Sequence, residues 1–285
     1  MVKTLIIGAN SQIGKELKEI VGNNLNFTFL NSTQLDLRKK DETLNYLKKK
    51  DYKVIVNLAA FTNVDKAEKN KKLCKLINFE SIKNIYSLLA KKNIYFIQIS
   101  SDFVFSDSNL HLDELANTNA INYYGHTKEL LEKFIFSYPY SNYCIIRTSS
   151  VFSKHNNNFV KTIIHNLKIN NSIELNNSIL TKPTSAISLA KFIYFLIIKN
   201  RIYGVVHFVN KPYLSWYSFA KKIEKKFLNT KAINFRSNIK KGNSYKTLAK
   251  RPNNSILSFS KRVSHNYKNQ ENWEKYLDED LKNLI

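Results

Sequence analysis

Apolar positions along the first 150 residues fall into two alternating patterns. Short apolar runs of strand length, rich in β-branched residues, occupy residues 2–7, 26–30, 52–57, 95–100 and 143–148. Between them, apolar side chains recur at helical spacing over residues 12–21, 41–49, 72–91 and 123–136. The runs are apolar throughout, as in strands that are covered on both faces. The pattern therefore predicts an α/β fold, a doubly wound parallel sheet of the Rossmann type.

The pattern loosens after residue 150. It predicts helices over 159–168 and 185–198, a late strand over 205–209, and a mostly helical segment from 215 to 285. We therefore expect a dinucleotide-binding domain made of residues 1–150 and 182–210. Residues 151–181 and 211–285 are expected to form a smaller, mostly helical substrate-binding lobe.

The length of the apolar runs, the first residues and the cysteines indicate the cellular compartment of the protein. The longest apolar runs of the 285 residues are too short for a membrane span, which needs about 20 residues. The first residues lead directly into a strand without the pattern of a signal peptide, so we expect a cytoplasmic protein without a membrane partner. Cys74 and Cys144 lie in apolar stretches, and we expect buried free thiols rather than a disulfide.

The net charge of +23 raises the alternative of a nucleic-acid-binding protein. Only six of the 45 basic residues are Arg, the residue suited to bidentate recognition of phosphates and bases. The Lys excess accompanies many Asn and Ile residues, which indicates codon bias. We expect no nucleic-acid partner, although the charge would help to attract a doubly phosphorylated substrate.

A glycine-containing turn joins the first strand to the first helix, where backbone N–H groups can hold a pyrophosphate. Its candidate cofactor-binding residues are Gly8, Asn10, Ser11, Gln12, Ile13 and Gly14. Ser11 stands where a middle glycine is usual, and an ordinary tight turn is the alternative. No acidic residue occurs at positions 30–33 to bind a ribose 2′-hydroxyl, which favours NADPH, with NADH as the alternative. We assign Asn31, Asp36 and Leu37 to the same cofactor site.

A Tyr four residues before a Lys places both side chains on one helix face, and this pattern occurs three times. The pairs are Tyr46/Lys50, Tyr124/Lys128 and Tyr217/Lys221. Only the second pair follows a strand whose end carries a hydroxyl, at Ser101. A phenol whose pKa is lowered by the Lys128 ammonium could protonate an alkoxide as hydride arrives, while Ser101 orients the carbonyl. The alternative for Ser101 is a hydroxyl that merely caps the strand.

Several ordered motifs resemble the dTDP-4-dehydrorhamnose reductases, a family of extended short-chain dehydrogenases. Residues 56–68 (VNLAAFTNVDKAE) resemble VNAAAYTAVDKAE, residues 100–105 (SSDFVF) resemble STDYVF, and residues 124–128 (YGHTK) resemble YGxTK. Residues 147–152 and 158–160 resemble RTSWVYG and NFV. The sequence departs from the family at Ser11, at Ser150 in place of a tryptophan, and at Ser178-Ile179 in place of DQ. The departures around the sugar pocket leave the substrate's identity open.

The resemblance implies an NADPH-dependent reductase of the 4-keto group of a nucleotide-linked deoxysugar. It places Leu58, Ala59, Ala60 and Thr62, with Tyr124 and Lys128, at the cofactor. Substrate would meet Val64, Asp102, Phe103 and Arg251. We assign no metal ligands, and a homodimer is one alternative for the assembly.

Three other functions are alternatives to the reductase. A 4,6-dehydratase usually carries Glu where this sequence has Phe103, which cannot move a proton. An epimerase that holds NAD tightly and a non-catalytic NADP-binding regulatory subunit both stay open. The intact set of Ser101, Tyr124 and Lys128 favours the reductase over the regulatory subunit.

Overall fold

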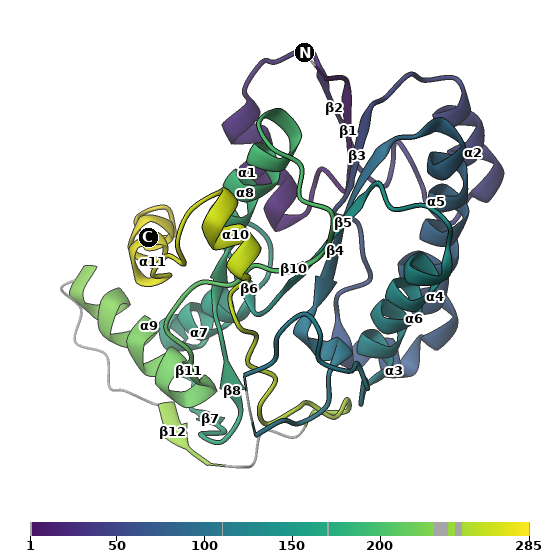
Figure 1. The fold of residues 1–285 in the computed structure, drawn as a ribbon. Helices are drawn as coiled ribbons and strands as arrows, with labels where there is room; N and C mark the ends of the chain where they lie inside the picture. The colour runs from purple at the N-terminus through teal and green to yellow at the C-terminus, as the bar shows by residue number, and fades with distance from the viewer. Residues whose placement is uncertain (1, 110, 170, 231–238, 243–246, 285) are drawn as a thin grey trace.

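A six-stranded parallel sheet forms the centre of the computed structural model, which describes residues 2–109, 111–169, 171–230, 239–242 and 247–284 (Figure 1). Its strand order is β2-β1-β3-β4-β5-β10. The strands are β1 (Thr4–Ile7), β2 (Phe27–Leu30), β3 (Val54–Asn57), β4 (Tyr95–Ser101), β5 (Tyr143–Thr148) and β10 (Gly204–His207). The order reverses between β1 and β3, and ligands bind at such a reversal, outside the carboxyl ends of the strands.

Helices cover both faces of the sheet (Figure 1). One face carries α1 (Gln12–Val21) and α8 (Ala186–Ile198), and the other carries α2 (Lys40–Lys48), α5 (Ser81–Lys92) and α6 (Tyr123–Ser137). Successive strand residues serve opposite cores, since Ile6 packs on the α8 side while Leu5 and Ile7 pack on the α5 side. The prediction of a doubly wound parallel sheet is confirmed.

The helix expected over 72–91 differs from the observed one. The chain forms α3 (Val64–Lys69) and α4 (Lys71–Lys75), passes through a π-helical turn (Leu76–Glu80), and continues as α5. The buried Asn78 in that turn bonds the backbone N–H and C=O of Phe61 at 2.8 and 3.1 Å and the Thr127 hydroxyl at 3.1 Å. The π turn thus directs the Asn78 side chain toward the loop that follows β3. The periodicity of the sequence cannot reveal this contact.

The C-terminal elements pack around an aromatic core. Helices α7 (Phe159–Lys168), α9 (Trp216–Thr230) and α11 (Glu274–Lys282) enclose the buried Phe219, Phe227 and Trp273. Short strands pair as β6 (Val151–Phe152) with β9 (Thr184–Ser185), β7 (Ile173–Leu175) with β12 (Ile239–Lys241), and β8 (Leu180–Thr181) with β11 (Leu214–Ser215). A 3-10 turn (Asp102–Val104) and α10 (Lys261–Asn266) complete the described elements. These two- and three-residue strands are too short to show a period, so the sequence did not predict them.

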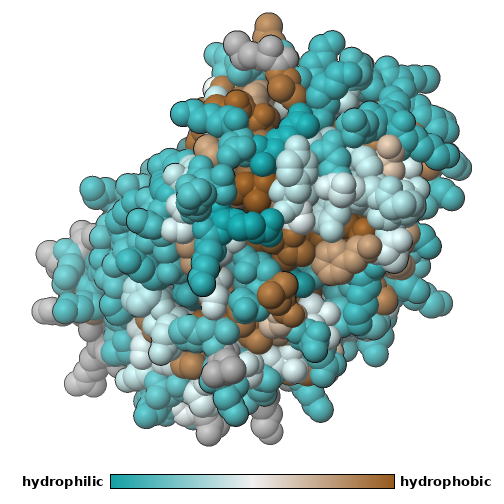
Figure 2. Space-filling model, in the orientation of Figure 1, coloured by the Kyte–Doolittle hydropathy of each residue, from teal (hydrophilic) through white to brown (hydrophobic). Residues whose placement is uncertain are grey.

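Two further expectations concern the surface and the thiols. Both cysteines are free and buried, as expected. Within the described part of the chain, no helix is long and apolar enough to cross a membrane. The face in Figure 2 is mostly hydrophilic, with hydrophobic side chains gathered near its middle. The boundaries expected for the two domains stay a prediction.

Candidate active site

A cleft of about 1520 Å³ opens at the carboxyl ends of the sheet strands and extends along the C-terminal elements. It brings together nearly every residue singled out in the sequence, with Gly14 packed behind the turn rather than on the lining. Those that line it are Gly8, Asn10, Ser11, Gln12, Ile13, Asn31, Asp36, Leu37, Leu58, Ala59, Ala60, Thr62, Val64, Ser101, Asp102, Phe103, Tyr124, Lys128 and Arg251. Their individual roles stay predictions.

The turn between β1 and α1 has the geometry of a phosphate site. Gly8 adopts φ +89°, and a Cβ there would lie 2.5 Å from the backbone nitrogen of Ala59. Only glycine permits both the conformation and this approach of the turn to the end of β3. Ser11 caps α1 by accepting the Gly14 N–H at 3.0 Å. The serine therefore performs a capping role in place of the expected glycine, and the N-terminus of α1 faces the cleft.

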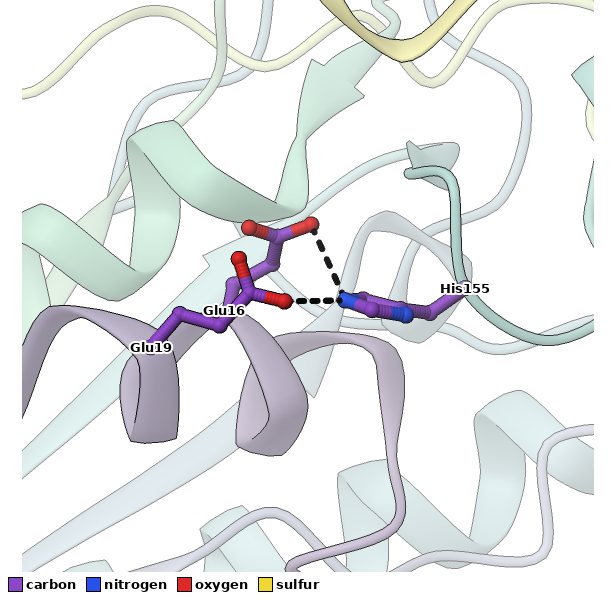
Figure 3. A group of neighbouring side chains, drawn as sticks. All are labelled: Glu16, Glu19 and His155. Carbon is purple, nitrogen blue, oxygen red and sulfur yellow. Dashed lines mark hydrogen bonds and ion pairs between the residues drawn. The ribbon is translucent and has the colours of Figure 1, made fainter. Parts of the chain in front are cut away.

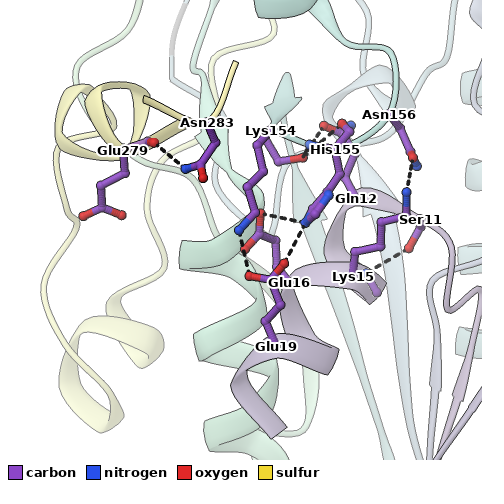
Figure 4. Close-up of polar contacts among 12 residues, drawn as sticks. Ser11, Gln12, Lys15, Glu16, Glu19, Lys154, His155, Asn156, Glu279 and Asn283 are labelled. Carbon is purple, nitrogen blue, oxygen red and sulfur yellow. Dashed lines mark hydrogen bonds and ion pairs between the residues drawn. The ribbon is translucent and has the colours of Figure 1, made fainter. Parts of the chain in front are cut away.

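A loop from the C-terminal half, residues 153–158, fastens this turn (Figure 4). Asn156 donates to the Asn10 carbonyl at 2.7 Å and accepts from Lys15 at 2.9 Å. The Gln12 side-chain oxygen accepts from Ser153 at 3.0 Å and from Asn158 at 2.9 Å. The loop is polar in the sequence, but its contacts with residues more than 140 positions away could not be predicted.

Ser101, Tyr124 and Lys128 meet on the floor of the cleft. Ser101 ends β4, Tyr124 lies in the first turn of α6, and the Lys128 ammonium lies 5.8 Å from the centre of the Tyr124 ring. A Cβ on Gly125 would lie 2.0 Å from the Phe103 carbonyl oxygen. The missing side chain lets α6 touch the turn after β4, which brings Tyr124 beside Ser101 and its ring edge-on to Phe103.

The titration of Tyr124 differs from the expectation. Burial, with a smaller effect of Asp102, raises the pKa of the phenol above its usual value. Burial also lowers the pKa of Lys128 to about 8, and its ammonium donates to the Ile99 carbonyl at 3.1 Å. The prediction of a lowered phenol pKa is therefore wrong for this structure, because burial has the largest effect on it. A phenol that stays protonated at neutral pH is suited to donating a proton.

Asp102 is a buried carboxylate directly behind Ser101. It accepts hydroxyl hydrogens from Ser101 at 3.0 Å, Ser149 at 2.8 Å and Ser255 at 3.1 Å. Burial raises its pKa to about 6, and these three hydrogen bonds oppose the rise. Since Ser101 has one hydrogen, the hydroxyl must turn from Asp102 toward the cleft in order to bind a carbonyl oxygen.

Arg251 and Asp65 face each other at the substrate end of the cleft. The Arg251 guanidinium lies 2.7 Å from the Asp65 carboxylate and 5.8 Å from the centre of the Trp216 ring. The Ala249 N–H donates to the same carboxylate at 2.9 Å. The pair connects the start of α3 with the segment after β12 and holds Arg251 at the cleft wall.

The two competing tyrosines lie elsewhere. Tyr46 on α2 shares a hydrogen bond of 2.8 Å with Tyr52, and Tyr217 lies on α9 in the C-terminal part. Among the described residues, neither lines the cleft. The sequence argument that chose Tyr124 therefore agrees with the placement of all three.

Glu16, Glu19 and His155 form a cluster outside the cleft (Figure 3), with potential metal-ligand atoms within 4.8 Å of one another. The Lys154 ammonium lies 2.7 Å from Glu19 in the same cluster (Figure 4). A cation of the chain itself thus already faces these carboxylates. We interpret the group as an ion-pair cluster.

Comparison with known proteins decides the family. The sequence pattern of the RmlD substrate binding domain matches residues 2–285. The chain belongs to this RmlD family. It is 30% identical to the dTDP-4-dehydrorhamnose reductase of Escherichia coli K12, with 90% of this chain and 89% of that protein aligned. The solved structure of the Bacillus anthracis dTDP-4-dehydrorhamnose reductase in complex with NADP is 30% identical, covers 99% of both chains and has a TM-score of 0.89.

A more distant structure shares the fold. The Bacillus anthracis dTDP-glucose 4,6-dehydratase is 13% identical and superposes with a TM-score of 0.78 over 99% of this chain and 96% of that one. Membership of the RmlD family confirms the resemblance seen in residues 56–68 and 100–105. Sequence reasoning missed other residues of the cleft lining, among them Ser32, Arg38, Asn156, Asn158 and Trp216.

Proposed function

We propose that this chain reduces the 4-keto group of a nucleotide-linked deoxysugar with NADPH, and that Tyr124 donates the proton. The observation that carries the proposal is the meeting of Ser101, Tyr124 and Lys128 in one cleft with the phosphate turn. The family relatives named as dTDP-4-dehydrorhamnose reductases, one of them solved with NADP, support the class of substrate and cofactor.

The residues present fit a dinucleotide. Gly8 leaves room where a Cβ would collide, and the N-terminus of α1 presents its first N–H groups to the cleft. When bound, NADPH would supply the hydride. Ser101 would hydrogen-bond the carbonyl oxygen, and Tyr124 would donate its phenolic proton to that oxygen as negative charge develops. The Lys128 ammonium, 5.8 Å from the Tyr124 ring, would stabilise the resulting phenolate.

The test is NADPH oxidation by the purified chain with a 4-keto-6-deoxy nucleotide sugar. Tyr124→Phe removes the proton donor, so kcat should fall at least about 100-fold while NADPH affinity changes less than about twofold. Tyr217→Phe removes a hydroxyl from the same sequence pattern on α9, and should leave both values unchanged.

Three results would contradict the proposal. A Tyr124→Phe enzyme with the wild-type rate would remove Tyr124 from the chemistry. A chain that binds NADPH but never oxidises it would fit the non-catalytic subunit, and interconversion of sugar epimers without net cofactor oxidation would fit the epimerase. The cytoplasmic location and a homodimer stay predictions.

A further inference from the structure

A smaller cavity of about 440 Å³ lies beside the end of β2. It shares Ser32, Leu35, Asp36 and Arg38 with the main cleft, so the two spaces adjoin along these residues. Its other lining residues are Thr33, Gln34, Lys39, Glu42, Thr43 and Tyr46. We call this space the side cavity. It extends the cleft at the edge of the sheet away from the C-terminal lobe.

Arg38 is held at the junction of the two spaces. Its Nε and Nη2 atoms donate to the two Asp36 carboxylate oxygens at 2.9 and 2.7 Å, and its backbone N–H donates to Asp36 Oδ1 at 3.0 Å. These bonds leave Nη1 outside the pair with Asp36. The Arg38 side chain is 58% exposed, so its guanidinium is both oriented and accessible.

The basic residues of the cleft lining lie in different parts of the cleft. Four basic residues are found in the described lining, namely Arg38, Lys128, Lys240 and Arg251. Lys128 lies beside Tyr124, while Lys240 and Arg251 belong to the C-terminal part, where Arg251 is paired with Asp65. Of the four, Arg38 is therefore the one at the β2 edge, and Lys39 on the described side-cavity lining is paired with Glu42 at 3.0 Å.

Asn31, the residue after β2, is neutral, and its side-chain oxygen accepts hydrogen bonds from the turn that it begins. The Asn31 side-chain oxygen accepts from the Thr33 N–H at 2.9 Å, the Thr33 hydroxyl at 2.6 Å and the Gln34 N–H at 3.2 Å. In dinucleotide-binding sheets the adenosine ribose lies beyond the second strand, where a carboxylate selects a free 2′-hydroxyl and an arginine accommodates a 2′-phosphate. Here positions 30–33 carry no carboxylate, and Arg38, seven residues after Asn31, lines the same cleft.

We propose that Arg38, at the mouth of the side cavity, binds the 2′-phosphate of the adenosine half of NADPH and sets the preference for NADPH over NADH. The guanidinium offers a planar set of donors to a phosphate, and the Asp36 pair orients it before binding. The Ser32 hydroxyl, on the lining of both spaces, would be a second donor to the same group. The inference rests on the proposed use of a dinucleotide, and extends it by naming the residue that discriminates between the two cofactors.

The test measures binding alone, without a sugar substrate. Adenosine 2′,5′-bisphosphate and 5′-AMP are titrated into the wild type and Arg38→Ala by calorimetry, followed by NADPH and NADH. A charge-assisted phosphate contact is worth about 1.5–3 kcal/mol, so Arg38→Ala should weaken the bisphosphate and NADPH about 10- to 100-fold. 5′-AMP and NADH should change less than about twofold. Arg38→Lys keeps the charge without the planar donors and should fall between.

Lys48→Ala is the control for net charge, because Lys48 is an exposed cation at the C-terminal end of α2. It should leave all four affinities unchanged. Equal weakening of NADPH and NADH by Arg38→Ala would overturn the proposal, since Arg38 would then act on the shared part of the cofactor. Unchanged NADPH affinity would overturn it as well. An enzyme that binds the bisphosphate through Arg38 but reduces no sugar would refute the proposed function and leave this inference intact.

Discussion

The Lys154 ammonium lies 2.7 Å from the Glu19 carboxylate and joins the loop after β6 to helix α1 (Figure 4). The same lysine partly offsets the negative charge at Glu16, and its backbone N–H donates to Asp280 on α11. Three distant segments thus converge behind the turn between β1 and α1. The same loop contacts Gln12 and Asn10, so one segment joins the cluster to the turn between β1 and α1.

The buried Glu16 gives the cluster a defined pH dependence. Burial raises the pKa of Glu16 from 4.5 to about 7, so the fold favours its neutral form. The associated stability is fully present below pH 4.5 and is lost as the pH rises through 7. Glu16→Gln mimics the neutral acid. It should match the wild type near pH 4.5 and be more stable than the wild type at pH 8, by up to about 3 kcal/mol.

Urea unfolding of both proteins at the two pH values measures the difference. Asp280, whose pKa burial raises to about 6, is present in both proteins, and its charge is one of the causes that raise the pKa of Glu16. Glu19→Gln is the control, since Glu19 is half exposed and paired with Lys154. That change should cost less than about 1 kcal/mol at pH 8. A Glu16→Gln protein no more stable than the wild type at pH 8 would show that Glu16 is ionised without penalty.

Gly125 controls the position of the proposed proton donor. An alanine Cβ would collide with the Phe103 carbonyl oxygen, so α6 must move away from the turn after β4. We expect Gly125→Ala to lower kcat at least about 10-fold, because small misplacements of a catalytic group are costly. At Gly22, φ is +59° but no atom lies within 4 Å of an added Cβ. Gly22→Ala should therefore cost about 1 kcal/mol of stability while kcat stays at the wild-type value.

Thermal unfolding of Gly125→Ala shows whether a lower kcat comes from a displaced α6 or from loss of the folded state. A Gly125→Ala protein that is as active as the wild type would show that α6 tolerates the shift and that the contact with Phe103 is dispensable.

The sequence predicted the fold and the trio because both depend on local order. Alternating strands and helices specify a doubly wound sheet, and Tyr124 and Lys128 share one helix face four residues apart. The sequence did not predict Arg38 and Asn156 as cleft residues, because their neighbours depend on the conformation of the turns in which they lie. Asn156 meets Asn10 across 146 positions, and nothing in its polar loop indicates that partner.

The sequence did not predict the raised pKa of Tyr124 for a related reason. A sequence shows a lysine four residues from a tyrosine, but not how completely both are removed from water. In this fold burial has the largest effect on the phenol's pKa, and that effect depends on the packing of α6 against β4 and the following turn.

Lys128 should set an alkaline limit to activity. Burial lowers the pKa of its ammonium from 10.5 to about 8, so the side chain is charged below and neutral above that value. Loss of the charge removes stabilisation of the Tyr124 phenolate, and kcat for keto reduction should fall as the pH rises through about 8. Lys128→Met should lower kcat at least about 10-fold, and its kcat should not fall further as the pH rises through 8. A wild-type profile that is flat from pH 7 to 10 would refute the role of the ammonium.

Glu132 and Arg147 form a buried ion pair behind the trio, each 2% exposed, at 2.7 Å between Oε2 and Nη2. Ser100 also donates to Glu132, and Arg147 lies beside His207, whose pKa burial and the guanidinium together lower to about 4. Removing one partner leaves a buried charge alone. Arg147→Met should therefore destabilise the fold by about 3–5 kcal/mol in urea unfolding.

The double variant Glu132→Leu/Arg147→Met removes both charges, and should recover at least half of that loss because replacement of a buried pair by apolar residues is often near neutral. The matched control is the exposed pair of Lys53 and Asp51, 2.8 Å apart, where Lys53→Met should change stability by less than about 1 kcal/mol. If the double variant is no more stable than Arg147→Met alone, the loss lies in the packing and in the Ser100 and His207 contacts rather than in an uncompensated charge. The buried pair would then support β4 and β5, and through them Ser101, mainly by its hydrogen bonds.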